Sequence, residues 1–305
     1  MNILITGGAG FIGSHTCERF INAGHRVTIA DNLSSGNLAN LGAVANEINF
    51  LELDVSDYER INDACRNTQA VLHLAAVSSV VRSIDRPIET NRVNIGGTIN
   101  VIEACRRQAV RRLILASSAA VYGDSQQLPF SEDSQTRPFS PYGWQKLTGE
   151  YYGSFYSMLS GTEFLALRYF NAYGPRQDPA SPYSGVLSIF AHRAKKKQPL
   201  TVYGDGGQTR DFIHVSDIAE VNLKAAEAAW PLPGIINVAT GSETSINEAA
   251  SIIQQHAGSS AGLIHKNRRA GDIYRSFSST GRLRNALGYV PQVLIEDGLK
   301  DLLEE

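Results

Sequence analysis

The chain has 305 residues, of which 43% are hydrophobic and 19% charged, and its formal net charge is −2. This composition fits a globular protein of one large or two modest domains, and the charge excludes a broad polyanion-binding surface, so we expect no nucleic-acid partner. The three cysteines and seven histidines show no metal-ligand or paired spacing, which predicts no metal and a reducing compartment. No signal-peptide pattern or bilayer-spanning apolar run is present, so we expect a cytoplasmic protein with no membrane partner.

Apolar runs alternate with amphipathic stretches in the first half of the chain. The apolar runs predict buried strands near residues 2–7, 26–31, 48–55, 70–76, 112–118 and 163–171. The amphipathic stretches predict helices near residues 14–24, 90–108 and 140–159. Strands and helices in alternation indicate an α/β fold with a Rossmann-type, doubly wound parallel sheet, and we assign residues 1–171 to this domain.

The composition changes after residue 171. Residues 171–185 are rich in turn formers and predict a loop. A helix at about 185–197, a strand at 200–204, a further segment at 210–229, a strand at 234–240 and a helix starting near Ser245 are expected to follow. We assign residues 172–305 to a smaller mixed α/β domain that binds the substrate, and expect the segment at about 210–240 to return to the first domain.

A glycine-rich motif, GGAGFIG, joins the first predicted strand to the first predicted helix. Gly7, Gly10 and Gly13 permit a tight turn that brings the backbone close to a pyrophosphate at the helix N-terminus. Asp31 ends the second strand, where a carboxylate accepts hydrogen bonds from a ribose and disfavours a 2′-phosphate. The motif therefore predicts that the cofactor is NAD rather than NADP.

Asp54, at the end of the third predicted strand, allows two interpretations. Its carboxylate could bind the adenine amino group, or it could cap the helix that follows. His73, in the fourth strand, is expected to have a structural role.

A second group of residues is expected at the same edge of the sheet. Ser118 ends the fifth strand, and Tyr142 and Lys146 stand four residues apart at the start of the next helix. Ligands of doubly wound sheets bind beyond the carboxyl ends of the strands. The Lys146 ammonium and an oxidised nicotinamide would lower the pKa of Tyr142, and Ser118 could hold the substrate oxygen. These groups can move a proton while a hydride leaves a carbinol carbon.

Several segments carry a family resemblance: TGGAGFIGSH, DNLSSG, HLAA, SSAAVYG, PYGWQK, RYFNAYGPRQDP, RDFIHVSD and RAGD. Over nearly its whole length the chain resembles the extended short-chain dehydrogenase/reductase superfamily, and within it the nucleotide-sugar 4-epimerases of the UDP-glucose/UDP-N-acetylglucosamine type. The resemblance implies NAD as cofactor, a UDP-sugar as substrate and Ser118, Tyr142 and Lys146 as the catalytic residues. Two departures are Gln145, where the family usually has serine, and the bulky Trp144; either could alter helix packing or dimer contacts.

The resemblance also implies which residues contact each ligand. The cofactor residues are Gly7, Gly10, Phe11, Ile12, Gly13, Asp31, Asn32, Leu33, Ser34, Ser35, Gly36, Asp54, Val55, Leu74, Ala75, Ala76, Tyr142, Lys146 and Tyr169. The substrate residues are Ser78, Ser118, Tyr142, Asn171, Tyr203, Arg210, Arg269, Asp272 and Ser276. Within that set Asn171 and the two arginines would bind the diphosphate, Asp272 the ribose and Tyr203 the uracil. The alternatives are surface cations for the arginines and a core aromatic for Tyr203.

Two features bear on the reaction and the sugar. Family members that dehydrate sugars carry an Asp-Glu pair directly after the serine, where this chain has Ala119 and Ala120. The alanines favour 4-epimerisation with tightly bound NAD. In related epimerases a tyrosine at the position of Ser276 restricts the enzyme to glucose and galactose. The small Ser276, together with Ser78, predicts that UDP-N-acetylglucosamine is accepted, alone or with UDP-glucose, unless another wall closes the pocket.

Other functions and the oligomeric state stay open at this level. The carboxylate substrate of a UDP-glucuronate 4-epimerase, or of a related reductase or decarboxylase, would need further hydroxyl or cationic donors near C5, and Arg82 is the candidate. A non-catalytic NAD sensor is a remote alternative. The resemblance implies a homodimer formed through helices near 90–108 and 142–158.

Overall fold

The computed structural model describes residues 1–125, 127–178, 185–268 and 273–304. Two predicted substrate residues, Arg269 and Asp272, lie outside the described residues. The main sheet has seven strands, all parallel, in the order β11-β6-β5-β4-β1-β2-β3. Their bounds are β1 (Asn2–Thr6), β2 (Arg26–Asp31), β3 (Ile48–Glu52), β4 (Ala70–His73), β5 (Arg112–Ser118), β6 (Glu163–Tyr169) and β11 (Ile235–Val238). The expected doubly wound α/β fold is confirmed.

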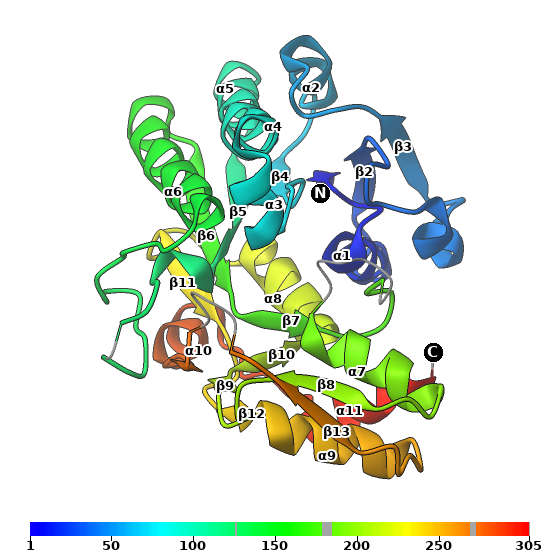
Figure 1. Ribbon diagram of the computed structural model, residues 1–305. Helices are drawn as coiled ribbons and strands as arrows, with labels where there is room; N and C mark the ends of the chain where they lie inside the picture. The colour runs from blue at the N-terminus through cyan, green and yellow to red at the C-terminus, as the bar shows by residue number, and fades with distance from the viewer. Residues whose placement is uncertain (126, 179–184, 269–272, 305) are drawn as a thin grey trace.

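Helices cover both faces of this sheet (Figure 1). One face packs against α1 (Phe11–Asn22), α8 (Val215–Glu227) and α10 (Gly281–Leu287). The other packs against α2 (Tyr58–Ala64), α5 (Thr98–Arg107) and α6 (Pro141–Ser160). Successive strand residues point to opposite faces, so Ile3 and Ile5 join the first core while Leu4 joins the second. Burial on both faces explains why the strands are continuous apolar runs.

The helix expected at residues 90–108 is divided into three consecutive segments. These are α4 (Pro87–Asn91), the π-helix η2 (Arg92–Gly97) and α5. The short helix α3 (Val80–Asp85) precedes them, and the 3₁₀ helices η1 (Leu38–Val44) and η3 (Ala119–Val121) follow β2 and β5. A π-helical turn inside a helix is uncommon and often lies at a functional site.

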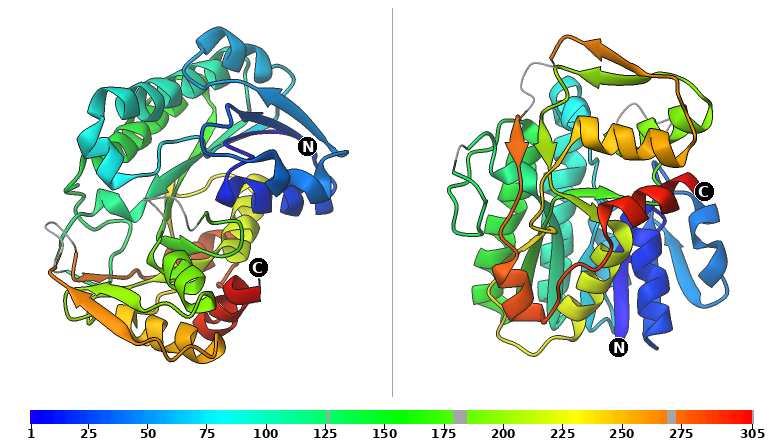
Figure 2. Two further views of the ribbon diagram at one scale, coloured as in Figure 1. Left: turned by 45° about the vertical axis from the view of Figure 1, so that its right-hand side comes forward. Right: turned by 90° about the horizontal axis from the view of Figure 1, so that it is seen from below.

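A smaller unit lies across one end of the main sheet (Figures 1 and 2). It contains β7 (Asn171–Tyr173), β8 (Leu200–Tyr203), β9 (Thr209–Arg210), β10 (Phe212–His214), β12 (Thr244–Ser245), β13 (Leu263–Lys266) and β14 (Arg275–Ser276). Its helices are α7 (Val186–Lys195), α9 (Ile246–His256) and α11 (Ile295–Glu304), which share a third core. The expectation of a loop from residue 171 is wrong for its first three residues, which form β7 and pair with β10.

The described part of the chain contains no membrane-spanning helix, disulfide or metal-binding group. None of its helices is long and apolar enough to cross a membrane. Its three cysteines are free and buried. No group of three or more His, Cys, Asp and Glu side chains within it could hold a metal ion.

Candidate active site

The loop between β1 and α1 forms a cradle of backbone atoms. Gly7 has a φ of +73°, and a Cβ there would stand 2.7 Å from the amide nitrogen of Ala75. A Cβ at Gly13 would stand only 2.1 Å from the Gly7 carbonyl oxygen. The helix α1 begins without a side-chain cap at Gly10, so its first backbone amides suit an anionic group. These features fit the pyrophosphate of a dinucleotide.

Asp31, at the end of β2, ties the cradle to the turn that follows. Its Oδ2 accepts a hydrogen bond from the Ala9 amide (3.0 Å), and its Oδ1 accepts one from the Leu33 amide (2.8 Å). A carboxylate has further lone pairs, so Asp31 can still accept hydrogen bonds from ribose hydroxyls. In the same turn Ser34 and Ser35 are exposed and Gly36 is half-buried.

Asp54 lies beyond the end of β3 and does not cap a helix. The N-cap of α2 is Asp57, whose side chain accepts from the Arg60 amide, so the capping interpretation of Asp54 is wrong. Asp54 instead accepts from the Ser56 amide (2.8 Å) and from the Asn32 side-chain amide (3.1 Å). Burial acts to raise the pKa of Asp54, but these hydrogen bonds outweigh burial and hold the pKa below its usual value. The ends of β2 and β3 are thereby joined by an anionic group.

The three predicted catalytic residues come together at the carboxyl end of β5. The Ser118 hydroxyl accepts from the Ala120 amide (3.1 Å) and lies close enough to the Tyr142 hydroxyl to act on its pKa. The Lys146 Nζ atom lies 5.8 Å from the centre of the Tyr142 ring and donates to the Ala116 carbonyl (2.8 Å). One helical turn separates the tyrosine and the lysine, so both side chains lie on the same face of α6.

Burial dominates the acidity of this pair. Burial raises the pKa of Tyr142 to about 12, and the Ser118 hydroxyl acts in the opposite direction. The Lys146 ammonium is directed to a backbone carbonyl, so the lowering predicted from the sequence would depend mainly on the charge of the nicotinamide. Burial also lowers the pKa of Lys146 to about 8, although the nearby Glu150 carboxylate acts to raise it.

Gly143 allows α6 to approach η3, the 3₁₀ helix that follows Ser118. A Cβ at this position would stand 2.6 Å from the Ala120 carbonyl oxygen and 2.9 Å from the Pro138 Cβ. The helix begins at Pro141, and the Ser140 hydroxyl caps it by accepting from the Gly143 amide (3.1 Å). The missing side chain therefore lets the first turn of α6 lie directly against η3.

A buried ion pair lies next to the predicted catalytic residues. Arg168 of β6 and Glu150 of α6 are 2% and 4% exposed and are joined at 2.7 Å. Ser117, next to the catalytic serine, donates to Glu150, and Arg168 donates to the Tyr122 hydroxyl (2.8 Å). Sequence reasoning missed this pair; the signal was a charged residue inside the apolar strand "FLALRYF".

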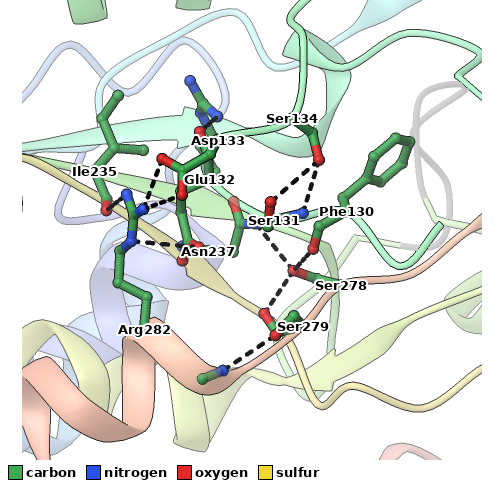
Figure 3. A network of polar contacts seen from close by, with 12 residues as sticks. Phe130, Ser131, Glu132, Asp133, Ser134, Ile235, Asn237, Ser278, Ser279 and Arg282 are labelled. Atoms are coloured by element: carbon green, nitrogen blue, oxygen red, sulfur yellow. Dashed lines mark hydrogen bonds and ion pairs between the residues drawn. The ribbon is translucent and has the colours of Figure 1, made fainter. Parts of the chain in front are cut away.

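A second polar network joins the loop after η3 to the segment that contains β14 (Figure 3). The Ser278 hydroxyl donates to the Phe130 carbonyl (3.0 Å). Glu132 accepts from the Asn237 amide (2.8 Å) and pairs with Arg282 (3.5 Å). The network therefore holds β14 against the main sheet.

Three of the predicted substrate residues converge on the backbone around Asp211. Arg210 lies in register with Ser276, across the pairing of β9 with β14. The Asn171 side-chain amide donates to the Asp211 carbonyl (3.0 Å). Ser276 is 7% exposed. Tyr203, half-buried at the end of β8, is connected to the same strands because its carbonyl accepts from Gln208 (2.7 Å).

The Asp211 carboxylate is a second residue that sequence reasoning missed. It is fully buried and accepts hydrogen bonds from Thr240 (amide 2.8 Å and hydroxyl 2.7 Å), Gly241 (2.9 Å) and Ser278 (3.3 Å). Burial raises its pKa, and these hydrogen bonds act to lower it. Asp211 thereby joins three segments that are far apart in the chain.

Other predicted residues lie in the loop after β4 or in the core of the main sheet. Ser78 is exposed in the loop after β4, which also contains the half-buried Leu74, Ala75 and Ala76. Tyr169 is buried, and its hydroxyl donates to Asn222 (2.6 Å). Its side chain is therefore committed to the core, and its predicted cofactor contact would involve the main chain. His73 is buried between two threonine hydroxyls, and burial lowers its pKa to about 3, as befits a structural role.

Comparison with known sequences identifies the family. The sequence profile of the NAD dependent epimerase/dehydratase family matches residues 3–239. The chain belongs to this family. A UDP-glucose 4-epimerase of Mycolicibacterium smegmatis is 35% identical to it over 100% of this chain and 98% of its own length. The family resemblance read from the sequence motifs is thus confirmed.

Solved structures of epimerases have the same fold over their full length. A UDP-glucose 4-epimerase from Thermotoga maritima, with UDP-glucose, has a TM-score of 0.95 and 34% identity, covering 100% of this chain and 98% of its own. A UDP-N-acetylglucosamine 4-epimerase from Methanobrevibacter ruminantium, with UDP-N-acetylmuramic acid, has a TM-score of 0.95 and 35% identity, covering 99% and 97%. The protein is an NAD-dependent epimerase, and the cradle and Asp31 fit its cofactor.

Proposed function

We propose that this epimerase interconverts the gluco and galacto forms of UDP-sugars at C4. The observation that carries the proposal is the proximity of Ser118 to Tyr142, with Lys146 one helical turn away and its Nζ atom 5.8 Å from the tyrosine ring. The pair lies at the carboxyl end of β5, and the glycine cradle lies at the carboxyl end of β1 in the same parallel sheet. A sugar held at this edge would face both the tyrosine and the cofactor.

The proposed chemistry needs one reversible proton transfer from the protein. Ser118 orients the 4-hydroxyl, and Tyr142 removes its proton and later returns a proton to O4, after the keto sugar has turned over so that C4 would receive the hydride on its opposite face. When bound at the cradle, NAD supplies the acceptor and donor of the C4 hydride and a positive charge that favours the tyrosinate. Ala119 and Ala120, on η3, have no proton to transfer, which supports epimerisation over dehydration or decarboxylation.

The proposed diphosphate site uses Asn171 on β7 and Arg210 on β9, two strands of the smaller unit. A guanidinium provides directed donors to phosphate oxygens. Arg269 for the diphosphate, Asp272 for the ribose and Tyr203 for the uracil complete the proposed substrate site. The anchored nucleotide would let the 4-keto sugar turn over without leaving the enzyme.

The proposed sugar range includes UDP-N-acetylglucosamine as well as UDP-glucose. Its support is Ser276, a small and buried residue in register with Arg210. Relatives of both sugar types match this chain with similar identity, so the resemblance alone does not choose between the sugars. A larger side chain at this position would fill the space that an acetamido group needs.

The test incubates the purified protein and added NAD with each UDP-sugar and follows the anomeric protons by NMR. We expect the galacto epimer from both UDP-glucose and UDP-N-acetylglucosamine. The Ser276→Tyr variant should still convert UDP-glucose, and its rate of conversion of UDP-N-acetylglucosamine should fall at least about tenfold. Conversion of UDP-glucose alone by the unmodified enzyme would preserve the chemistry and refute the role of Ser276.

The same NMR assay includes UDP-glucuronate as a third substrate. Arg82, the expected recognition residue for a sugar carboxylate, is already paired with Glu89, which weakens the case for that substrate. Turnover of UDP-glucuronate alone would replace the proposed substrate. Retention of NAD without turnover of any of the three sugars would instead favour a non-catalytic sensor.

The proposed active form is a homodimer joined through the outer face of α6. This face exposes large apolar side chains, among them Trp144, Tyr151, Phe155, Met158 and Leu159. An open groove of about 590 Å³ adjoins it, lined by Asn91, Ile95, Pro138, Phe139, Ser140, Pro141, Trp144 and Gln145. Apolar surface of this kind marks interfaces. Light scattering should give twice the 33.1 kDa chain mass, and a monomeric mass at micromolar concentration would contradict the dimer.

A further inference from the structure

Gln145, on the inner face of α6, forms a side-chain amide network in which every hydrogen-bonding group of its amide has a partner. It is 1% exposed, and its Nε2 donates to the Thr90 hydroxyl (2.9 Å) and to Asn91 Oδ1 (2.7 Å). Its Oε1 accepts from Asn94 Nδ2 (2.7 Å). A side-chain amide has two N–H donors, and both are used here in addition to the carbonyl. A satisfied buried network of this kind fixes the relative position of the elements it joins.

Asn94 carries this connection onward to the loop after β4. Its Oδ1 accepts from the Val77 amide (2.8 Å), and its Nδ2 donates to the Val77 carbonyl (3.0 Å). Asn94 is 2% exposed and belongs to the π-helix η2. The two-way contact leaves Val77 with both of its backbone polar groups bound to one side chain.

The clamped loop connects the two ligand sites of the proposed enzyme. Residues 74–76 of this loop are predicted to contact the cofactor, and Ser78 is predicted to contact the sugar. A second contact joins the next element to the same helix, because the Tyr142 amide donates to the Ser83 hydroxyl (3.1 Å). The loop is therefore attached to α6 on both sides of Ser78.

We propose that Gln145 and Asn94 form a brace that sets the distance between the loop at residues 74–79 and the catalytic tyrosine. Gln145 is thus a positioning residue for the proposed epimerisation, on which this inference rests. The sugar must meet Tyr142 from both faces during one cycle, so displacement of one wall should slow the chemical step more than it weakens substrate binding. The brace also holds the cofactor side of the loop and should slow the loss of NAD.

The test compares two nearly isosteric substitutions in the full-length, NAD-loaded enzyme. Gln145→Met keeps the length of the side chain and removes the acceptor for Asn94. Thr90→Val is the matched control, since it removes a hydrogen-bond partner of the same amide and leaves the contact with Asn94 in place. Gln145→Met removes three hydrogen bonds of the network and Thr90→Val removes one of them, so Gln145→Met should lose more thermal stability. The kinetics are therefore compared at a temperature at which both variants are fully folded.

We expect Gln145→Met to lower kcat about tenfold while KM changes less than about threefold. NAD should also dissociate several-fold faster from this variant, whereas Thr90→Val should match the unmodified enzyme in kcat and in NAD retention. Equal effects of the two substitutions, or an unchanged kcat in Gln145→Met, would overturn the brace. If the unmodified enzyme converts no UDP-sugar, the proposed function fails, and the NAD dissociation rates alone decide whether the brace exists.

Discussion

The proposed catalytic corner and the proposed substrate corner of this molecule are built in different ways. Ser118, Tyr142 and Lys146 come from two segments separated by a single loop, and short-range contacts align them. The backbone that holds Arg210 and Ser276 is gathered from distant segments around a buried carboxylate. Changes in the first corner should therefore alter rate without unfolding the protein, whereas changes in the second should cost stability.

The largest expected effect tests the catalytic corner. Tyr142→Phe removes the proposed acid–base group and its contact with Ser118, and should lower kcat about 1000-fold. The phenyl ring retains the packing, so the melting temperature should change by no more than about 2 °C. Steady-state kinetics and thermal unfolding on the same preparation check both statements. Loss of activity that follows loss of folded protein would contradict the contrast between the corners.

The second expected effect tests the substrate corner. Asp211→Asn places amide hydrogens against backbone amides that now donate to a carboxylate, and should destabilise the protein by about 3 kcal/mol. Urea unfolding measures this change. Asp133→Asn is the control, because Asp133 forms an exposed pair with Arg282 that should contribute less than about 1 kcal/mol. Similar losses for the two substitutions would refute the proposed importance of the Asp211 hydrogen bonds.

A third prediction tests the close approach of α6 to η3, the 3₁₀ helix that follows Ser118. The methyl group of Gly143→Ala would overlap the Ala120 carbonyl and push the first turn of the helix outward, which should lower kcat about tenfold or more. A Cβ at Gly42 would meet nothing within 4 Å, so Gly42→Ala should leave kcat unchanged. If Gly143→Ala has normal activity, the close contact is not needed to align Tyr142 with Ser118.

The fourth prediction concerns pH. Burial lowers the pKa of Lys146 to about 8, so the ammonium is present below that pH and is lost above it. If the ammonium is the active form, kcat/KM should decline about tenfold per pH unit above about pH 8. Lys146→Arg should abolish this alkaline limb, because a guanidinium does not lose its proton in that range. Persistence of the limb in Lys146→Arg would assign it to another group.

Much of the main sheet could be predicted because its signals are local. Strand β5 occupies residues 112–118 as expected, since a strand buried on both faces is a continuous apolar run. Helix α9 begins after Ser245, where a capping box marks its start. The division of the 90–108 helix by η2 could not be predicted, because that turn packs against Gln145 and Val77 from other parts of the chain.

In the site, too, the residues marked by signals in the neighbouring sequence could be predicted, and those that depend on contacts between distant segments could not. Ser118, Tyr142 and Lys146 are adjacent to recognisable glycine, proline and serine signals, and the structure brings them together. The burial that raises the pKa of Tyr142 could not be predicted, because it depends on every element around the ring. Asp211 and the Glu150–Arg168 pair were missed because their partners lie in distant segments.

The edge strand β11 has a consequence for how this chain can be divided. It joins the main sheet from beyond residue 230 and pairs with β6, while α8, which precedes it and also follows residue 171, packs against α1. A fragment ending at residue 171 would leave β6 as a bare, apolar edge and uncover the buried side of α1. Such a fragment should aggregate rather than bind NAD alone, and the two ligand-binding parts should melt in one cooperative transition.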